Sequence, residues 1–164
     1  MNPTPKEIKW PAGFDPSHSP VYVKNDLHMK ANPGEVWTHL TRANTWPEWY
    51  PNASRVKLIN QRVDQLQSRT KFRWKTFGIS LVSEVVEYVP HERIAWTALG
   101  MGVKAYHAWL IIPESNGCHV ITEETQHGWL SRLGKIFFPK RMHKLHQLWL
   151  TELEKKAAGI SRSK

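Results

Sequence analysis

Two side chains of this sequence that could exchange a proton, His107 and Glu124, stand on either side of the dipeptide Asn116-Gly117. Asn-Gly between two apolar runs is typical of a β-hairpin. If both form the centre of the turn, Ser115 pairs with Cys118. Because side chains alternate along a strand, His107 and Glu124 then share one face of neighbouring strands, nearly opposite each other.

A paired histidine and carboxylate can do chemistry. Glu124 would orient the His107 ring and stabilise its charge, leaving the imidazole as a general acid or base toward a carbonyl or hydroxyl compound. The alternative is a buried polar pair that satisfies its own hydrogen bonds and fixes the strand register. We favour this structural interpretation, because the sequence identifies no third catalytic group beside the pair.

Other reactive groups lack a supporting pattern. We expect no metal and no cofactor, because His143 and His146 stand three apart on an expected helix without a third ligand at suitable spacing. Cys118 lies beside a turn with no helix N-terminus to activate it. No Gly-x-Ser-x-Gly elbow is present, and Gly100-x-Gly102 is a turn signal without a following helix.

Hairpin parity predicts which side chains share the face of His107 and Glu124. Carried across the turns near residues 78, 90, 100 and 116, it gives a face that is mostly apolar and aromatic. One helix cannot fill a curved sheet of this size, so we expect a cavity with a few polar groups, a typical binding site. The predicted ligand-binding residues are Phe72, Trp74, Leu81, Ser83, Val85, Trp96, Ala98, His107, Trp109, Thr122, Glu124, Met142, Leu145 and Trp149.

The elements that position this face form an α+β pattern. Strands are expected at 21–30, 55–59, 70–77, 79–89, 92–99, 103–113 and 118–127. Asn32 and Pro33 predict the start of a short helix, and Pro47 and Pro51 bracket a second one. From residue 129 the period becomes helical, with an apolar stripe of Phe138, Met142, Leu145, Trp149 and Leu153. We therefore predict a curved antiparallel sheet around a long C-terminal helix, with two short helices between the first two strands, and a split near Pro139.

Composition narrows the function classes. The net charge is +9, but no zinc-finger, helix-turn-helix or ribonucleoprotein motif accompanies the scattered Lys and Arg residues, so we expect no nucleic acid partner. No apolar run approaches the length of a membrane span. Cys118 is the single cysteine, which excludes an intrachain disulfide and makes the cytoplasm the expected compartment.

The order of elements, together with particular motifs, resembles the START-like (SRPBCC, helix-grip) superfamily, and within it the polyketide cyclase/dehydrase and lipid transport family. The motifs that carry the resemblance are Ala31-Asn32-Pro33-Gly34-Glu35-Val36-Trp37, Trp46-Pro47-Glu48-Trp49-Tyr50-Pro51, Pro90-His91-Glu92-Arg93-Ile94-Ala95-Trp96, Tyr106-His107-Ala108 and the strand end from Glu124 to Gly128. The resemblance implies a deep cavity for lipids, sterols, polyketides or other hydrophobic molecules, with Trp96, His107 and Glu124 on its wall. The resemblance does not determine an activity, because proteins with this fold include both carriers and enzymes.

We therefore expect an extended arm at residues 1–19, one START-like domain at 20–158 and a basic tail at 159–164. The expected function is binding of a hydrophobic small molecule such as a lipid or polyketide, with transport as an extension. An enzyme of cyclase or dehydratase type, using His107 as the proton carrier, is the first alternative. The second is contact with an anionic membrane or a protein through Phe137-Phe138-Pro139-Lys140-Arg141, where apolar residues precede basic ones.

Overall fold

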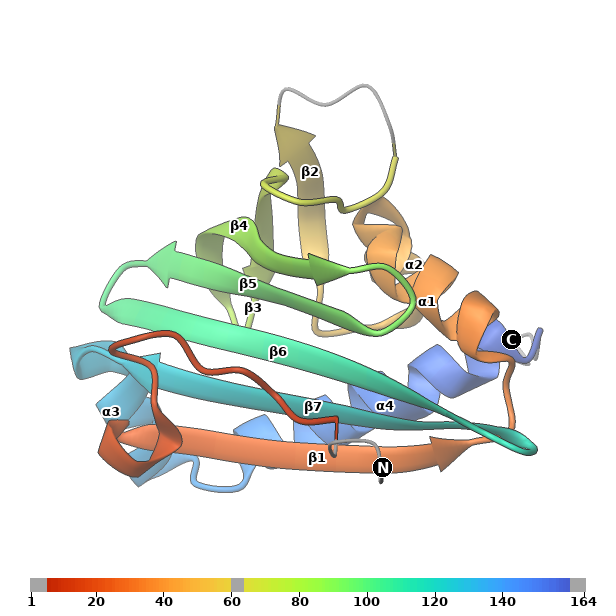
Figure 1. Cartoon of the computed structure of the whole chain (residues 1–164). Coiled ribbons are helices and arrows are strands. Elements are labelled where there is room, and N and C mark those ends of the chain that lie inside the picture. The colour runs from red at the N-terminus through yellow and green to blue at the C-terminus, as the bar shows by residue number, and fades with distance from the viewer. Residues whose placement is uncertain (1–5, 60–63, 160–164) are drawn as a thin grey trace.

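The computed structural model describes residues 6–59 and 64–159, and within these ranges seven antiparallel strands form one curved sheet (Figure 1). Their order across the sheet is β1-β7-β6-β5-β4-β3-β2, so β2 to β7 form a meander and β1 pairs with its last strand. This confirms the predicted sheet. The strands are β1 Val21–Met29, β2 Ser54–Ile59, β3 Lys71–Thr76, β4 Ile79–Val89, β5 Arg93–Gly100, β6 Val103–Glu114 and β7 Gly117–His127.

The helices also follow the prediction. Between β1 and β2 lie α1 (Pro33–Thr41), a 3-10 turn (Ala43–Thr45) and α2 (Trp46–Trp49). The Asn32 side chain caps α1 by accepting a hydrogen bond of 2.8 Å from the backbone N–H of Gly34. Pro139 separates α3 (Trp129–Phe137) from the long α4 (Arg141–Ala157). None of the described helices has the length and apolarity that crossing a membrane requires.

Aromatic side chains dominate the core between the concave face of the sheet and α4. Trp149 on α4 stacks on Tyr50 with ring centroids 4.4 Å apart and meets Trp46 edge-on at 5.0 Å. Trp96 and Trp109, from β5 and β6, pack against the same indole. All five rings are fully buried, so they anchor α4 to both the sheet and α2.

The buried face of α4 differs from the predicted stripe. It consists of His146, Trp149, Leu150, Glu152 and Leu153. Phe138 precedes α4 and is 59% exposed, so its place in the stripe was wrong. The one buried position between Met142 and Trp149 is taken by His146, and a search for apolar residues does not count a histidine.

The arm before β1 packs on the outer, convex face of the sheet. Phe14 and Trp10 contact the Tyr106 ring at centroid distances of 5.5 Å each. Tyr106, Ala108 and Ala95 are buried in this second, smaller core. Tyr106 alternates with His107 along β6 and therefore lies on the opposite, outer face of the sheet, and the arm is the reason that it is nevertheless buried.

The β6–β7 register differs from the predicted one by two residues. Cys118 pairs with Pro113 rather than with Ser115, and the turn lies at Ser115-Asn116. Gly117 has already entered β7, where a Cβ atom would lie 1.9 Å from the carbonyl oxygen of Met29. This glycine therefore permits a close backbone approach to the end of β1. A slip of two leaves the faces unchanged, and His107 pairs directly with Glu124.

Candidate functional site

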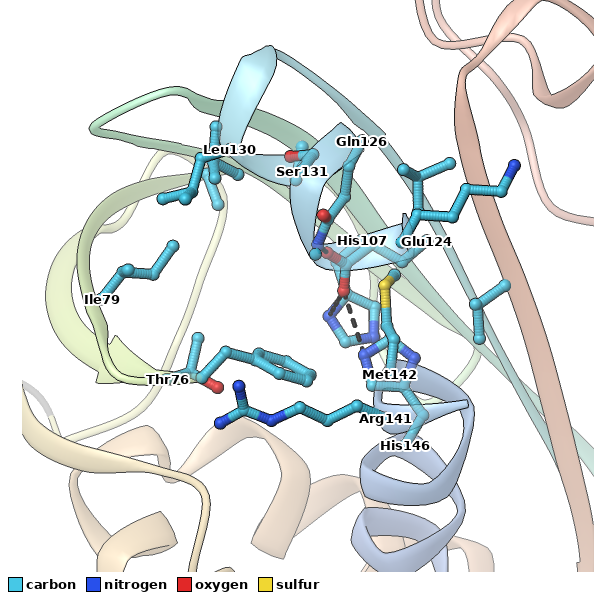
Figure 2. A pocket seen from close by; sticks show the side chains of 18 of the residues that line it. Thr76, Ile79, His107, Glu124, Gln126, Leu130, Ser131, Arg141, Met142 and His146 are labelled. Carbon is cyan, nitrogen blue, oxygen red and sulfur yellow. Dashed lines mark hydrogen bonds and ion pairs between the residues drawn. The ribbon is translucent and has the colours of Figure 1, made fainter. Parts of the chain in front are cut away.

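A cavity of about 410 Å³ lies between the concave face of the sheet, α3 and the start of α4 (Figure 2). The strands supply mostly apolar walls, including Trp74, Leu81 and Trp96. Polar groups enter from one side, where Figure 2 shows Glu124, Gln126 and His107 on the sheet opposite His146 on α4. An apolar pocket of this size with a few convergent polar groups has the form of a small-molecule site.

The cavity wall under α3 differs from the rest because its residues are exposed to solvent. Leu133, Phe137 and Phe138 line the cavity and are 41%, 68% and 59% exposed, whereas His146 at the inner end is buried. The cavity therefore opens toward α3 and the loop that follows it. Arg141 borders this opening, with its guanidinium over the rings of Phe77 and Phe138.

The structure separates the predicted binding residues into three groups. Eight of them line the cavity: Trp74, Leu81, Trp96, Ala98, His107, Glu124, Met142 and Trp149. Phe72, Ser83, Val85, Trp109 and Thr122 are buried beside it without lining it. Leu145 lies on the other side of α4, in a shallow groove with Lys140, Arg141 and Lys144.

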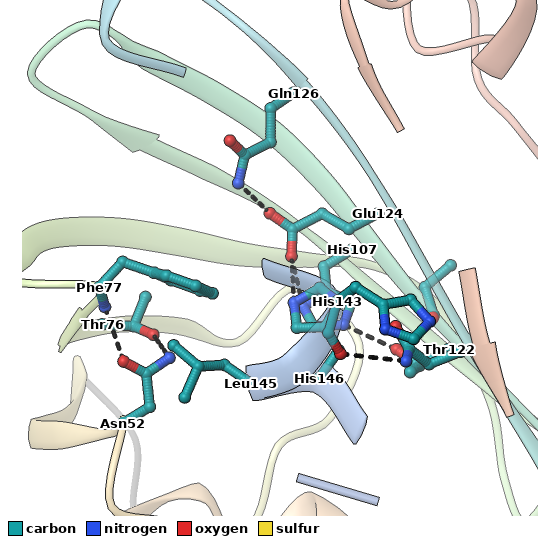
Figure 3. Close-up of polar contacts among 12 residues, drawn as sticks. Asn52, Thr76, Phe77, His107, Thr122, Glu124, Gln126, His143, Leu145 and His146 are labelled. Carbon is teal, nitrogen blue, oxygen red and sulfur yellow. Dashed lines mark hydrogen bonds and ion pairs between the residues drawn. The ribbon is translucent and has the colours of Figure 1, made fainter. Parts of the chain in front are cut away.

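The polar end of the cavity is built around the Glu124 carboxylate (Figure 3). Its Oε2 atom lies 3.1 Å from Nδ1 of His107 and also 3.1 Å from Nε2 of His146. Its Oε1 atom accepts a hydrogen bond of 2.6 Å from the Gln126 amide. The side chains of His107, Glu124 and His146 are only 3%, 9% and 1% exposed, so this cluster is almost free of bulk water.

The two histidines are held differently. Nε2 of His107 shares a hydrogen bond of 2.7 Å with the Thr122 hydroxyl, which also lies 3.3 Å from the carbonyl oxygen of Ala108. The Nδ1 atom of His146 is buried and has no hydrogen-bond partner in the described structure. Both ring nitrogens of His107 are therefore engaged, whereas His146 keeps one nitrogen without a partner.

Burial sets the protonation of the cluster. It lowers the pKa of His107 to about 3, an effect that Glu124 opposes only in part, so this imidazole is neutral near neutral pH. Burial acts to raise the pKa of Glu124, but His107, His146 and Gln126 outweigh it and hold that pKa below its usual range. The cluster thus contains a buried carboxylate facing a neutral imidazole.

Sequence reasoning paired His107 with Glu124 correctly but missed His146. The prediction compared His146 with His143, a solvent-exposed neighbour. A different spacing carried the signal, because His146 lies four residues after Met142 and three before Trp149, on the inward stripe of the helix. Only the packing of α4 over the sheet brings His146 to the carboxylate, and no local pattern reports that contact.

This arrangement can be compared with known proteins. The sequence profile of the family described as polyketide cyclase/dehydrase and lipid transport matches residues 21–158, most of the chain. The chain belongs to that family. No curated protein sequence matches it.

Solved structures extend the relationship at the level of fold. The hypothetical protein jhp0584 from Helicobacter pylori is 27% identical, with a TM-score of 0.86 over 94% of this chain and 98% of its own. The Zhui aromatase/cyclase from Streptomyces sp. R1128 is 12% identical, with a TM-score of 0.69 over 84% and 93%. A START superfamily protein from Mycobacterium smegmatis is 14% identical, with a TM-score of 0.69 over 85% and 99%. The helix-grip architecture of the START-like superfamily is therefore shared by all of these proteins.

Proposed function

We propose that this family member binds a hydrophobic small molecule with one oxygen-bearing end. The supporting observation is the cavity of about 410 Å³, whose walls are mainly apolar and whose polar groups gather at its inner end. Apolar surface removed from water contributes about 25 cal/mol per Å² to binding. The apolar part of the ligand thus supplies most of the affinity, and Gln126 and the histidines orient its polar end.

Two neighbouring positions on β5 allow a matched test of the cavity. Ala98 is buried and lines the cavity, whereas Leu99, the next residue, is 54% exposed on the outer face. Ala98→Trp places an indole inside the cavity, and Leu99→Trp adds the same indole outside it. Native mass spectrometry of the purified protein should find a retained lipid- or polyketide-sized molecule, absent from Ala98→Trp and present in Leu99→Trp.

Thermal unfolding of both variants checks that each is folded before they are compared. Retention of the same molecule by folded Ala98→Trp would place binding elsewhere. The absence of any bound mass, together with no uptake from a panel of fatty acids, sterols and aromatic polyketides, would refute the proposal.

A cyclase- or dehydratase-type reaction is a second candidate, favoured by the histidines that converge on Glu124. A general base needs a free nitrogen, and Nδ1 of His146 lacks a partner whereas both nitrogens of His107 are engaged. His146 therefore fits the role of proton carrier better than His107. With a turned-over ligand in hand, His146→Gln should abolish turnover and retain binding. Unchanged turnover in this variant would exclude His146 as the proton carrier, and a bound molecule that the unmodified protein leaves unchanged would favour a carrier.

Delivery at a membrane surface is supported by α3. Its exposed apolar side chains border the cavity opening, and residues 128–151 contain five Lys or Arg and no Asp or Glu. An apolar face next to cations suits a bilayer with anionic lipids. Co-sedimentation with vesicles should therefore depend on their content of anionic lipid. A cytoplasmic location, which the single buried Cys118 favours, would offer such a surface.

A further inference from the structure

The three side chains at the inner end of the cavity also have the chemistry of a metal site. Their candidate donor atoms are Nδ1 of His107, Nε2 of His146 and Oε2 of Glu124, all within 4.8 Å of one another. Bonds of about 2.0–2.1 Å, as in zinc sites, place neighbouring ligand atoms roughly 3.0–3.4 Å apart. Both nitrogen-to-oxygen distances here are 3.1 Å. Hydrogen bonds that donate to a carboxylate are typically shorter when charge-assisted, about 2.7–2.9 Å.

Two of these three residues are also held by hydrogen bonds through the polar atoms that would not bind the metal. Gln126 binds the other carboxylate oxygen of Glu124 at 2.6 Å. The Thr122 hydroxyl can accept the Nε2–H of His107 while donating to the carbonyl oxygen of Ala108, since it lies within reach of both. With a metal ion bound, that chain would select the tautomer of His107 in which Nδ1 carries no proton and its lone pair faces the ion. The ion would then take the place of the proton between Nδ1 and Glu124. Such outer contacts orient histidine and carboxylate ligands in metalloproteins.

Three separate elements position the donors. His107 lies on β6, Glu124 on β7 and His146 on α4, and the imidazole rings stack at a centroid distance of 4.8 Å. All three residues border the cavity. An ion held by them keeps a further coordination position toward the bound molecule, as in sites with three protein ligands and one exchangeable ligand.

We propose that His107, Glu124 and His146 bind one divalent transition-metal ion, with Zn²⁺ the best match to two imidazoles and one carboxylate. The open position accepts a water molecule or an oxygen atom of the cavity ligand. The ion would act there as a Lewis acid that polarises a carbonyl group or binds a hydroxyl group. Metal binding of this kind goes beyond the proposed small-molecule binding and does not depend on it.

A second histidine cluster must be removed before the metal is measured. Asp26, His28 and His119 form another group of potential ligands on the outer face of the sheet, among the described residues. These histidines stack on each other and already pair with Glu114 and Asp26. The double substitution His28→Gln/His119→Gln eliminates this exposed cluster and leaves the cavity unchanged, so it serves as the background for the test.

The experiment uses the full chain in that background, treated with chelator and then titrated with Zn²⁺ in a calorimeter. We expect one equivalent to bind. Adding His146→Gln should weaken binding on the order of 100-fold or more, because a ligand is lost. His143→Gln, an exposed histidine on the same helix, is the matched control and should change nothing.

Co²⁺ gives an independent readout, because ligation by two nitrogens and a carboxylate at low coordination number produces visible absorption bands. These bands should appear in the His28→Gln/His119→Gln background. If His146→Gln fails to fold, as judged by circular dichroism, Glu124→Gln takes its place. If that variant also fails to fold, Co²⁺ binding to the folded background decides alone. Less than a tenth of an equivalent of Zn²⁺ bound in the background, absent Co²⁺ bands, or unchanged Zn²⁺ affinity in the folded ligand variant would each overturn the proposal.

Discussion

Removing the two phenylalanines that follow one another at the cavity opening should weaken membrane binding strongly. Phe137 and Phe138 are 68% and 59% exposed, and a phenylalanine offers about 200 Å² of surface, so they present roughly 135 and 120 Å². At about 25 cal/mol per Å², full insertion into lipid contributes about 6 kcal/mol, and insertion to half that depth about 3 kcal/mol. Phe137→Ser/Phe138→Ser should therefore lower the partition coefficient roughly a hundredfold.

The assay is co-sedimentation with vesicles of phosphatidylcholine alone and with added phosphatidylserine, at low and high salt. Leu99→Ser is the matched control, because it removes an exposed apolar side chain from the outer face of β5 that does not line the cavity or its opening. Binding by the double variant within twofold of the unmodified protein would refute the reasoning about insertion. Equal binding to both vesicle types would refute the contribution of the Lys and Arg residues, for which we expect about 1 kcal/mol each near the surface.

Three further predictions concern stability. Trp149→Ala removes the indole that joins α4 to the sheet and should lower the free energy of unfolding by about 3–5 kcal/mol in urea titrations; a loss below 1 kcal/mol would contradict this packing. Gly128→Ala should lower the free energy of unfolding by roughly 2–4 kcal/mol, because the φ of Gly128 is +109° and a Cβ would lie 2.2 Å from the carbonyl oxygen of Gly102. Gly134→Ala on α3 should be neutral or stabilising, because nothing lies near its Cβ. Calorimetric melting that ranks the two variants the other way would disprove this. Because the pKa of His107 is lowered to about 3 in the metal-free folded protein, the unfolded chain takes up its proton first as the pH falls below about 6.5. The free energy of unfolding should then decrease by up to about 1.4 kcal/mol per pH unit between pH 6 and 4 in chelator-treated protein, and His107→Gln should remove that part of the slope.

Most of the fold could be predicted because its signals are local. Asn32 and Pro33 mark the start of α1, and Pro139 separates α3 from α4. The alternation of side chains along each strand assigns them to the two faces of the sheet. The β6–β7 register was wrong by two residues because Asn116-Gly117 was read as the turn itself. Gly117 is instead required in β7, because a side chain there would collide with the backbone of Met29 on β1. A hairpin pattern in the sequence cannot reveal this contact with a distant strand.

The candidate site was only half predictable. His107 and Glu124 are cross-strand partners, so period-two alternation placed them together whatever the exact turn. His146 reaches the same carboxylate from a helix packed over the sheet, and its rotation depends on Trp149, Tyr50 and their neighbours. The burial of Tyr106 by Phe14 has the same origin, since an arm without periodicity gives no sign of the face it covers.

The indole cluster around Trp149 also makes the protein its own optical probe. Trp74, Trp96 and Trp149 border the cavity, and Trp46 and Trp109 lie close enough to these rings for excitation energy to pass among them. A molecule entering the cavity, or a paramagnetic ion at its inner end, changes the surroundings of several emitters at once. Occupancy of the site can therefore be followed by ultraviolet fluorescence of the unlabelled chain, without knowing in advance what the occupant is.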